Sequence, residues 1–267
     1  MKGKQTVDQV TAEVRYLNSE WKGRDDRPFI YSKSTRQKNT TKYPVEITDA
    51  RELAADGRLD LDSNGFVLTK HDTKVDSFHE ELSVKASYET EIVPMLQRLT
   101  GATLIRVVGH QLRTEEPKTF LGAYSRYLHC DYPLTPSEDR ESNLLGRSVE
   151  GLKYAWYNIW EPVDRPATQN QLTVLDARTL DLQEDICEYH FTDKREGGYA
   201  AIPVYNKNHR FYYFSNMKPG EAIVFKQFDS RPGKAFVCPH TAFYDPNRSP
   251  NQNGRRSVEF RALCVFE

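Results

Sequence analysis

The part of the chain that follows Gly101 is a long series of short extended stretches, and this pattern constrains the fold most strongly. Turns such as Lys218-Pro219-Gly220 separate stretches rich in β-branched and aromatic residues, a composition typical of strands. Many short strands joined by turns predict a mainly β fold, either a jelly-roll or a distorted barrel. The predicted strands cover residues 103–108, 120–131, 152–161, 171–176, 200–205, 209–214, 221–226, 234–239 and 257–266.

One segment before Gly101 has the spacing of a helix instead. Residues 82–100 carry apolar side chains at helical intervals, and Gly101 provides a stop signal. Pro94 is expected to kink this helix or to open its second half. A shorter helical stretch is expected at 138–149. The apolar face of the longer helix is predicted to contain Val84, Tyr88, Ile92, Met95, Leu96 and Leu99.

The beginning of the chain lacks a regular pattern. Residues 1–45 are polar and are interrupted by glycine and proline, so we predict an irregular N-terminal arm with short strands only at 13–17 and 29–31. A further extended piece is expected at 47–51, and a tight turn at 62–65 leads into a short strand. Because no internal repeat or low-complexity linker divides the sequence, residues 1–267 are predicted to form a single domain.

The charge balance bears on the partners that the chain can have. Lys+Arg number 37 and Asp+Glu 38, so no net field attracts nucleic acid or an anionic membrane, and small neutral or zwitterionic partners are expected. The first residues carry no apolar run that would predict a signal peptide or a membrane span. The four cysteines lack metal-binding spacing and are expected to be reduced thiols of a cytoplasmic protein.

Three residues have the types and spacing of an iron site. On an extended strand, residues two apart project from the same face, so His129 and Asp131 would present an imidazole and a carboxylate together while Cys130 points away. A second histidine from a distant strand would complete a facial set that holds Fe(II) and leaves three positions open. His240, which follows the predicted strand 234–239, is the candidate for this third ligand.

Other interpretations stay open on these residues alone. A single H-x-D is a weak signal, because a solvated His-Asp pair at a strand end and a structural core histidine are both common. The chain contains a second match, His79-Glu80-Glu81, but it lies in an acidic approach to the predicted helix and is a poor metal site. The alternative third ligands are His71, His110, His190 and His209.

The last predicted strand alternates between a polar and an apolar face. Arg255, Ser257, Glu259 and Arg261 share the polar face. Since a guanidinium grips a carboxylate through two hydrogen bonds, this face is expected to bind an anion inside the barrel. The alternative is a solvated face on which Glu259 pairs with an arginine. The opposite face carries Arg256, Val258, Phe260, Ala262 and Cys264.

Taken in order, these residues resemble the Fe(II)/2-oxoglutarate-dependent oxygenases. His129-x-Asp131, His240 and Arg255-x-Ser257 follow one another as in that family, and the chain is similar to the hydroxylase/desaturase group related to the cephamycin methoxylase and gibberellin desaturase. The resemblance implies a double-stranded β-helix (jelly-roll) with flanking helices. It covers most of the chain and includes Ile47-Thr48-Asp49-Ala50-Arg51, Gly65-Phe66, Tyr88, Glu91, Gly101-Ala102, Asn158-Ile159-Trp160, Phe211-Tyr212-Tyr213-Phe214, Met217, Asp229-Ser230, Pro239-His240-Thr241-Ala242-Phe243 and Asp245-Pro246.

The resemblance also implies an activity and its cofactors. His129, Asp131 and His240 would hold Fe(II), and 2-oxoglutarate would bind the iron at one end. Its far carboxylate would meet Arg255 or Arg261, with Ser257 nearby, and Arg255 is preferred because it opens the strand. Oxygen would then oxidise a small secondary metabolite or an amino-acid-derived compound. The choice between hydroxylation, desaturation and cyclisation stays open, as does the oligomeric state, with a homodimer among the alternatives.

The predicted strand 152–161 contains the candidates for substrate contact. Asn158 and Trp160 share one face and are candidates for substrate contact, whereas Tyr157 and Ile159 would face the other layer. The hydroxylase/desaturase group that the chain resembles usually has the sequence Trp-Arg-Pro where this chain has Trp160-Glu161-Pro162. This departure puts an anion-binding role for position 161 in doubt. Elsewhere, Lys226 and Asp229 are expected to form a surface ion pair.

Two other classes of function compete with the oxygenase. A metal-dependent hydrolase or isomerase would use the same ligands to activate water, and a non-catalytic barrel would bind a small ligand with the histidines in structural roles. The arginine-bearing strand argues mildly against the hydrolase. A serine hydrolase is disfavoured because the sequence has no G-x-S-x-G elbow.

Overall fold

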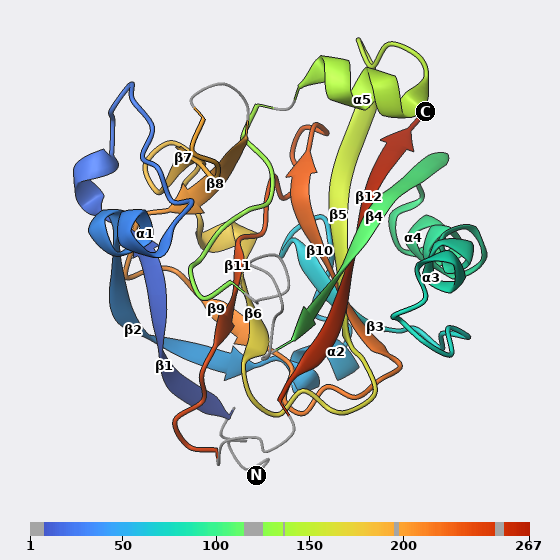
Figure 1. The fold of residues 1–267 in the computed structure, drawn as a ribbon, viewed down its shortest axis with the longest axis horizontal. Helices are drawn as coiled ribbons and strands as arrows, with labels where there is room; N and C mark the ends of the chain where they lie inside the picture. Colours follow the sequence, from blue (N-terminus) through green and yellow to red (C-terminus); the bar gives the residue numbers. More distant parts are fainter. Residues whose placement is uncertain (1–7, 115–124, 136, 195–197, 249–253) are drawn as a thin grey trace.

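Two five-stranded β-sheets form the body of the molecule, and a two-stranded sheet lies beside them (Figure 1). The computed structural model describes residues 8–114, 125–135, 137–194, 198–248 and 254–267. Apolar side chains from both large sheets share one buried cluster, which includes Trp160, Phe225 and Val174. This two-sheet arrangement confirms the jelly-roll predicted from the strand pattern.

The first large sheet contains the N-terminal strands and the strand that begins with His240. Its order is β1 (Gln9–Leu17), β2 (Thr40–Asp49), β9 (Phe211–Tyr213), β6 (Gln171–Leu175) and β11 (His240–Phe243). The second has the order β3 (Phe66–Lys70), β10 (Glu221–Asp229), β5 (Lys153–Pro162), β12 (Arg256–Phe266) and β4 (Leu104–Thr114). The small sheet pairs β7 (Ile186–His190) with β8 (Tyr199–Pro203).

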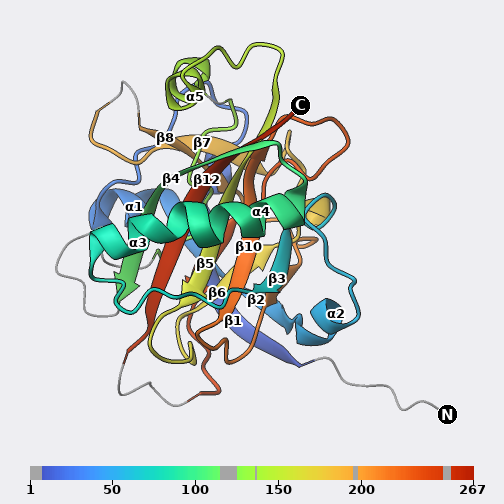
Figure 2. The same ribbon diagram turned by 90° about the vertical axis from the view of Figure 1, so that its right-hand side faces the viewer.

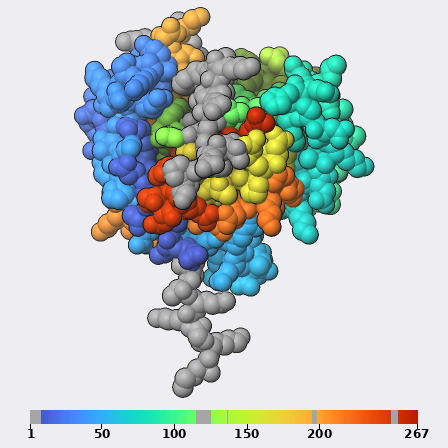
Figure 3. Space-filling model, turned by 60° about the horizontal axis from the view of Figure 1, so that its bottom comes forward, coloured from blue at the N-terminus to red at the C-terminus, as the bar shows by residue number. Residues whose placement is uncertain are grey.

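The helices lie outside the sheets. They are α1 (Lys33–Asn39), α2 (Arg51–Ala55), α3 (Glu81–Ser87), α4 (Val93–Thr100) and α5 (Glu138–Leu145), with a π-helical turn, η2 (Tyr88–Ile92), between α3 and α4. In Figure 3 the N-terminal segment (blue) and the α3–α4 segment (teal) occupy opposite flanks of the molecule. None of the described helices has the length and apolar character needed to cross a bilayer.

The helix predicted at 82–100 is present and is interrupted next to Pro94. The π-helical turn precedes the proline, whose missing amide hydrogen breaks the regular α-helical ladder. Gly101 adopts a φ of 71°, a left-handed conformation that ends α4 as predicted. Leu99 departs from the prediction, because it lies on the solvent side of α4 and is 36% exposed.

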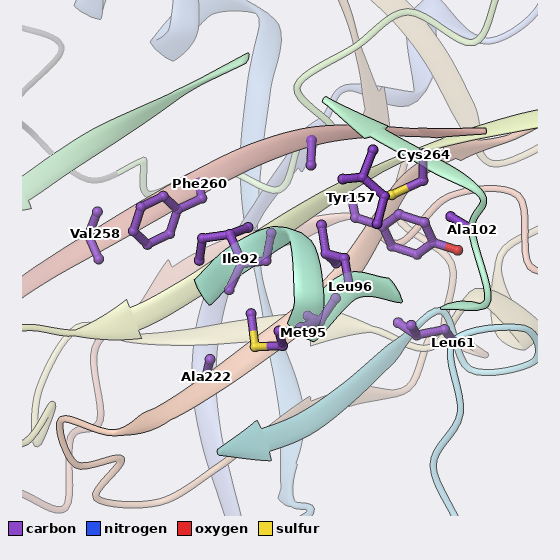
Figure 4. Close-up of a cluster of buried hydrophobic side chains, with 14 of the residues drawn as sticks. Leu61, Ile92, Met95, Leu96, Ala102, Tyr157, Ala222, Val258, Phe260 and Cys264 are labelled. Atoms are coloured by element: carbon purple, nitrogen blue, oxygen red, sulfur yellow. The ribbon is translucent and has the colours of Figure 1, made fainter. Parts of the chain in front are cut away.

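Helix α4 crosses the outer face of the second sheet (Figure 2). Ile92, Met95 and Leu96 are buried there, and the close-up in Figure 4 shows them over the strands. Val258 and Phe260 of β12 point into this layer, as the predicted alternation requires. The other face of β12 is therefore turned toward the interior between the sheets.

The prediction of an irregular arm over residues 1–45 is wrong for most of this segment. β1 pairs with β2 in antiparallel register from Gln9 opposite Thr48 to Leu17 opposite Thr40. The side chains of β1 alternate between exposed and buried, but polar residues on the exposed side hid this pattern. Pro44 is tolerated because it lies outside the part of β2 that also pairs with β9.

Two strand predictions near the expected metal ligands also need correction. Residues 234–239 are not a strand; the strand begins only at His240, after Pro239, which has no amide hydrogen to donate. In the predicted strand 120–131, residues 120–124 lie outside the described residues. The remainder forms only isolated bridges, at His129 and Cys130.

Candidate active site

His129, Asp131 and His240 converge between the two large sheets. Their ligand atoms all lie within 4.8 Å of one another, and no other group of histidine, cysteine and acidic residues in the described part of the chain has this geometry. The Nε2 atom of His129 is 3.8 Å from Oδ1 of Asp131, and Nε2 of His240 is 4.0 Å from Oδ2. The structure therefore brings the three predicted ligands together.

A pair of backbone hydrogen bonds sets this arrangement. The amide of His129 donates to the carbonyl of His240 at 3.1 Å, and the reverse bond measures 2.9 Å. Residues directly opposite each other on antiparallel chains place their side chains on the same side. The two imidazole rings consequently lie 4.4 Å apart between centroids, although their residues are 111 positions apart in the sequence.

The surroundings favour the neutral form of both histidines and fix the tautomer of His129. Nδ1 of His129 donates to the carbonyl of Tyr127 at 2.8 Å, which leaves the lone pair of Nε2 facing the site. Burial lowers the pKa of His129 and, more strongly, that of His240. The rings are thus neutral at physiological pH and can donate a lone pair to a metal.

The carboxylate of Asp131 is held by side chains from the second sheet. Nδ2 of Asn158 on β5 donates to Oδ2 at 2.6 Å, and the guanidinium of Arg261 on β12 lies 3.0 Å from Oδ1. Burial opposes ionisation of Asp131, but the charges of Arg261 and the two histidines outweigh it and hold its pKa below the usual range. Asp131 is therefore an anion, as a metal ligand must be.

Gln227 is a contributor that sequence reasoning missed. Its Oε1 accepts the backbone amide of Asp131 at 2.7 Å, and its Nε2 donates to the carbonyl of Cys238 at 3.2 Å and lies 3.5 Å from Nδ1 of His240. It lies on β10 and is 1% exposed. A glutamine at the end of an apolar strand gives no signal in the sequence that it spans two distant segments.

The polar face of β12 is buried rather than solvated. Arg261 binds Glu259 at 3.0 Å as well as Asp131. Arg255 is 2% exposed, donates to the carbonyl of Asn170 and lies over the ring of Trp160. Because Arg255, Ser257 and Glu259 are enclosed, the interpretation of this face as solvated is wrong here.

Two cavities adjoin the three ligands. The larger, of about 570 Å³, is lined by His129, Asp131 and Arg261. The smaller, of about 30 Å³, is lined by all three candidate ligands together with Arg255 and Trp160. The candidate ligands thus adjoin a space large enough for a small organic molecule, and Arg255 lines the smaller space beside them.

Comparison with known proteins assigns the chain to a family. Residues 14–265 match the family described as Oxidoreductase/YMDC permease-like domain. The hydroxylase/desaturase CTB9 of Cercospora beticola is 31% identical over 81% of this chain and 75% of its own length. The chain belongs to the hydroxylase/desaturase family of oxidoreductases.

Further relatives support the resemblance to the Fe(II)/2-oxoglutarate-dependent oxygenases. The alpha-ketoglutarate-dependent dioxygenase tstK of Talaromyces stipitatus is 24% identical over 78% of this chain and 80% of its own length. The solved structure of the iron and alpha-ketoglutarate-dependent endoperoxidase NvfI superimposes with a TM-score of 0.87 at 19% identity, covering 98% of this chain and 99% of that one. The fold class and the classification as an Fe(II)/2-oxoglutarate-dependent oxygenase are confirmed.

The other histidines of the chain lie outside this site. None of them joins a metal-binding group within the described residues. His79, the second H-x-E match, is exposed on a separate depression. The four alternative third ligands have partners outside the site: His71 binds Glu161, His110 binds Tyr88, His190 stacks on Phe29 and His209 contacts Asp185.

The Glu161 departure from the family pattern has a structural explanation. Glu161 is 1% exposed, and its carboxylate is 2.8 Å from Nδ1 of His71 in the layer between the second sheet and the helices. Because side chains alternate along β5, Asn158 and Trp160 lie on the interior face while Tyr157 and Glu161 face the helices. The side chain at position 161 therefore points away from the cavities.

Lys226 and Asp229 are also not where the sequence placed them. Both are buried, and Nζ of Lys226 lies 2.5 Å from Oδ2 of Asp229 and 3.1 Å from Oδ1 of Asp62. Arg231 binds the same two carboxylates. The expected surface ion pair is therefore a buried network that ties β10 to the turn at residues 61–64.

Proposed function

We propose that this chain uses Fe(II) and 2-oxoglutarate to oxidise a C–H bond of a small organic molecule, a secondary metabolite or an amino-acid-derived compound. The buried convergence of two neutral imidazoles and one carboxylate carries this proposal. That donor set suits ferrous iron and leaves coordination positions free for other ligands. Hydroxylation, desaturation and oxidative cyclisation all fit the site.

Each side chain of the site has a separate role in the proposal. Nε2 of His129, Nε2 of His240 and the carboxylate of Asp131 hold the metal. Gln227 and Asn158 fix the position of Asp131 through its amide and its Oδ2 atom. When bound, iron and 2-oxoglutarate supply the oxidising power, while the protein orients the reactants and excludes water.

Arg255 is the better candidate for the far carboxylate of 2-oxoglutarate. It lines the small cavity together with the three candidate ligands. Arg261, the alternative, binds Asp131 and Glu259 and is not among the described residues that line this cavity. Ser257 supports this choice, because its buried hydroxyl has no hydrogen-bond partner among the described residues and fits a bound anion. Arg261 then serves to orient Asp131.

The two candidates for substrate contact take different positions. Asn158 donates to Asp131 and is fully buried, whereas Trp160 lines the small cavity beside Arg255. We propose that both shape the reaction space from β5, Asn158 through the metal ligand and Trp160 through the cavity wall.

The proposal extends to the chain as a whole. Residues 1–267 act as one oxygenase domain in the cytoplasm, where the four free cysteines stay reduced. The partners are a small substrate and oxygen, without nucleic acid or membrane. A homodimer is compatible with this scheme, and a measurement of the mass in solution decides it.

The direct test measures succinate formed by the protein purified without oxygen and supplied with Fe(II) and 2-oxoglutarate. Optical absorption reports on cosubstrate binding in the same sample. We expect both signals from the natural chain and neither from His129→Ala. His79→Ala is the matched control, because this exposed histidine lies outside the site and its loss leaves both signals intact. Identical behaviour of the natural chain and His129→Ala overturns the proposal.

The same sample discriminates the two rival classes. A hydrolase or isomerase would need the metal but not oxygen, so turnover that persists in an anaerobic vessel favours that class. A non-catalytic barrel would bind no transition metal when freshly purified.

A further inference from the structure

The larger cavity is strongly basic although the chain as a whole is nearly neutral. Seven of its 17 described lining residues are arginine or lysine, and Asp131 is the single acidic residue among them. The formal net charge of the full chain is only −1. The fold therefore gathers positive charge at the entrance to the candidate metal site, which favours an anionic ligand.

Arg15 on β1 and Arg36 on α1 are two of the basic residues that line this cavity. Nη1 of Arg15 donates to the carbonyl and hydroxyl of Thr40 at 3.2 and 3.1 Å, which fixes its position. Arg36 on α1 lies over the ring of Tyr127 at 5.8 Å. Among the described residues, neither arginine has a carboxylate within the 4.0 Å of an ion pair. Glu13, the acidic residue of β1, pairs with Lys42 instead. Burial and the charge of Arg36 together lower the pKa of Arg15.

Tyr127 links this charge to the candidate metal ligands. Its ring centroid lies 4.9 Å from that of His129 and 5.8 Å from the guanidinium carbon of Arg36. Both Tyr127 and His129 line the cavity. A ligand whose anionic group met Arg36 would extend along the tyrosine ring toward His129. Apolar surface is available for its body, since the same cavity is lined by Ile30, Tyr127, Tyr189, Phe191 and Ala200.

We propose that the substrate is an amphipathic organic anion, whose acidic group binds at Arg15 and Arg36 and whose apolar body lies along Tyr127 toward His129. This inference rests on the proposed function, which makes His129 a ligand of the reactive metal. It replaces the expectation of a neutral or zwitterionic partner, which came from a net charge that averages over the whole surface. A carboxylate and a phosphate share the chemistry required.

The test compares a matched acid and amide as probes of metal-free protein. Isothermal titration calorimetry measures the affinity of 3-phenylpropanoate, 3-phenylpropanamide and phenyl phosphate. We expect the acid to bind about tenfold more tightly than the amide, the value of one charge-assisted hydrogen bond pair. The preference weakens as salt is added. The phenyl phosphate arm shows whether a phosphate or a carboxylate suits the site better.

Variants assign the preference to the cavity. Arg36→Gln removes most of the difference between acid and amide, whereas Lys38→Gln, on the same helix but outside the cavity, leaves it unchanged. Arg15→Gln is the second variant, and circular dichroism checks that each variant is folded. Equal affinities for acid and amide, no binding of either, or an undiminished preference in both folded variants overturns the inference.

These experiments distinguish a failure of this inference from a failure of the proposed function. If the acid preference is absent while iron and 2-oxoglutarate still bind, the inference fails and the oxygenase stands. If the metal-free protein prefers the acid but binds no iron, the anion site stands and the proposed function fails.

Discussion

At the scale of single residues, the candidate metal site depends on a few buried polar side chains that are not themselves ligands. Gln227 is the clearest example, because it joins the amide of Asp131 on one segment to the carbonyl of Cys238 on another. Such groups set the orientation of the ligands, and their loss typically lowers metal affinity by about 10- to 100-fold.

The first prediction concerns Gln227→Leu. The substitution keeps the volume but leaves the buried amide of Asp131 without its acceptor, so the carboxylate loses its fixed position. We expect Fe(II) affinity to fall by about 10- to 100-fold, measured by competition with a chelator under anaerobic conditions. Gln97→Leu on the exposed side of α4 is the control. Unchanged affinity in a folded Gln227→Leu protein would show that the glutamine has no positioning role.

The second prediction concerns the buried network around Lys226. Asp229→Ala leaves a fully buried ammonium without its nearest carboxylate, so we expect the free energy of unfolding to fall by about 3–5 kcal/mol. Urea denaturation measures this change. Glu81→Ala breaks an exposed pair with Lys85 on helix α3 and should lower the free energy of unfolding only slightly. Similar losses in both variants would contradict the difference in burial.

At the scale of elements, β12 is the part that joins stability and function. One face packs under α4 through Val258 and Phe260, and the other carries Glu259 and Arg261 toward Asp131. Since side chains alternate along a strand, packing of the apolar face fixes the register of the polar one. The helix layer therefore helps to set the geometry of a site that it does not touch.

The third prediction tests the apolar face of β12. Phe260→Ala removes a fully buried ring and should lower the free energy of unfolding by about 3–5 kcal/mol, measured by urea denaturation. Leu82→Ala is the control, because Leu82 is 84% exposed and its truncation should have little effect. If the two variants lost equal stability, the cluster under α4 would not be the core.

The fourth prediction concerns the contact of His71 with the carboxylates of Glu161 on β5 and Glu91 at the π-helical turn, 2.8 and 3.2 Å away. Burial lowers the pKa of His71, but the two carboxylates outweigh it and the net pKa is raised above about 6.5. A raised pKa means that the folded state binds the proton more tightly. This contribution to stability is complete below about pH 6.5 and is lost as the pH rises through the folded-state pKa.

Urea denaturation at acidic and alkaline pH measures this effect. The stability difference between the natural chain and His71→Gln should be larger at pH about 5.5 than at pH about 8.5. The matched control is His79→Gln, at an exposed position outside this contact. A difference that grows with pH would reverse the sign and reject this account.

At the scale of the whole molecule, two opposed sheets enclose a site built from both. His240 begins a strand of the first sheet, while Asn158 and Arg261 belong to the second. Because groups from both sheets hold the proposed ligands, the binding free energy of a metal at this site would add to the free energy of folding.

The fifth prediction follows from this linkage. Fe(II) at about a hundredfold excess over its dissociation constant should add about 2.7 kcal/mol to the free energy of unfolding. A thermal melt under anaerobic conditions should therefore move upward by several degrees, and a chelator should reverse the shift. His129→Ala should show no metal-dependent shift, whereas His79→Ala should keep it. Equal shifts in these two variants would place the metal elsewhere.

The sequence by itself determined those features that depend on neighbours along the chain. Alternation along residues 257–266 assigned the two faces of β12, and helical spacing with Pro94 and Gly101 located the helix and its interruption. The residue types at 129, 131 and 240 already limited the metal chemistry, because two imidazoles and a carboxylate suit few metals.

Only the tertiary structure decided which distant groups meet. It paired His129 with His240, enclosed Lys226, and turned the polar N-terminal segment into two strands of a sheet. It also gathered basic residues from separate elements around one cavity in a nearly neutral chain. The physical reason is that strand pairing and burial depend on contacts between residues far apart in sequence, whereas local patterns carry only the preferences of each segment.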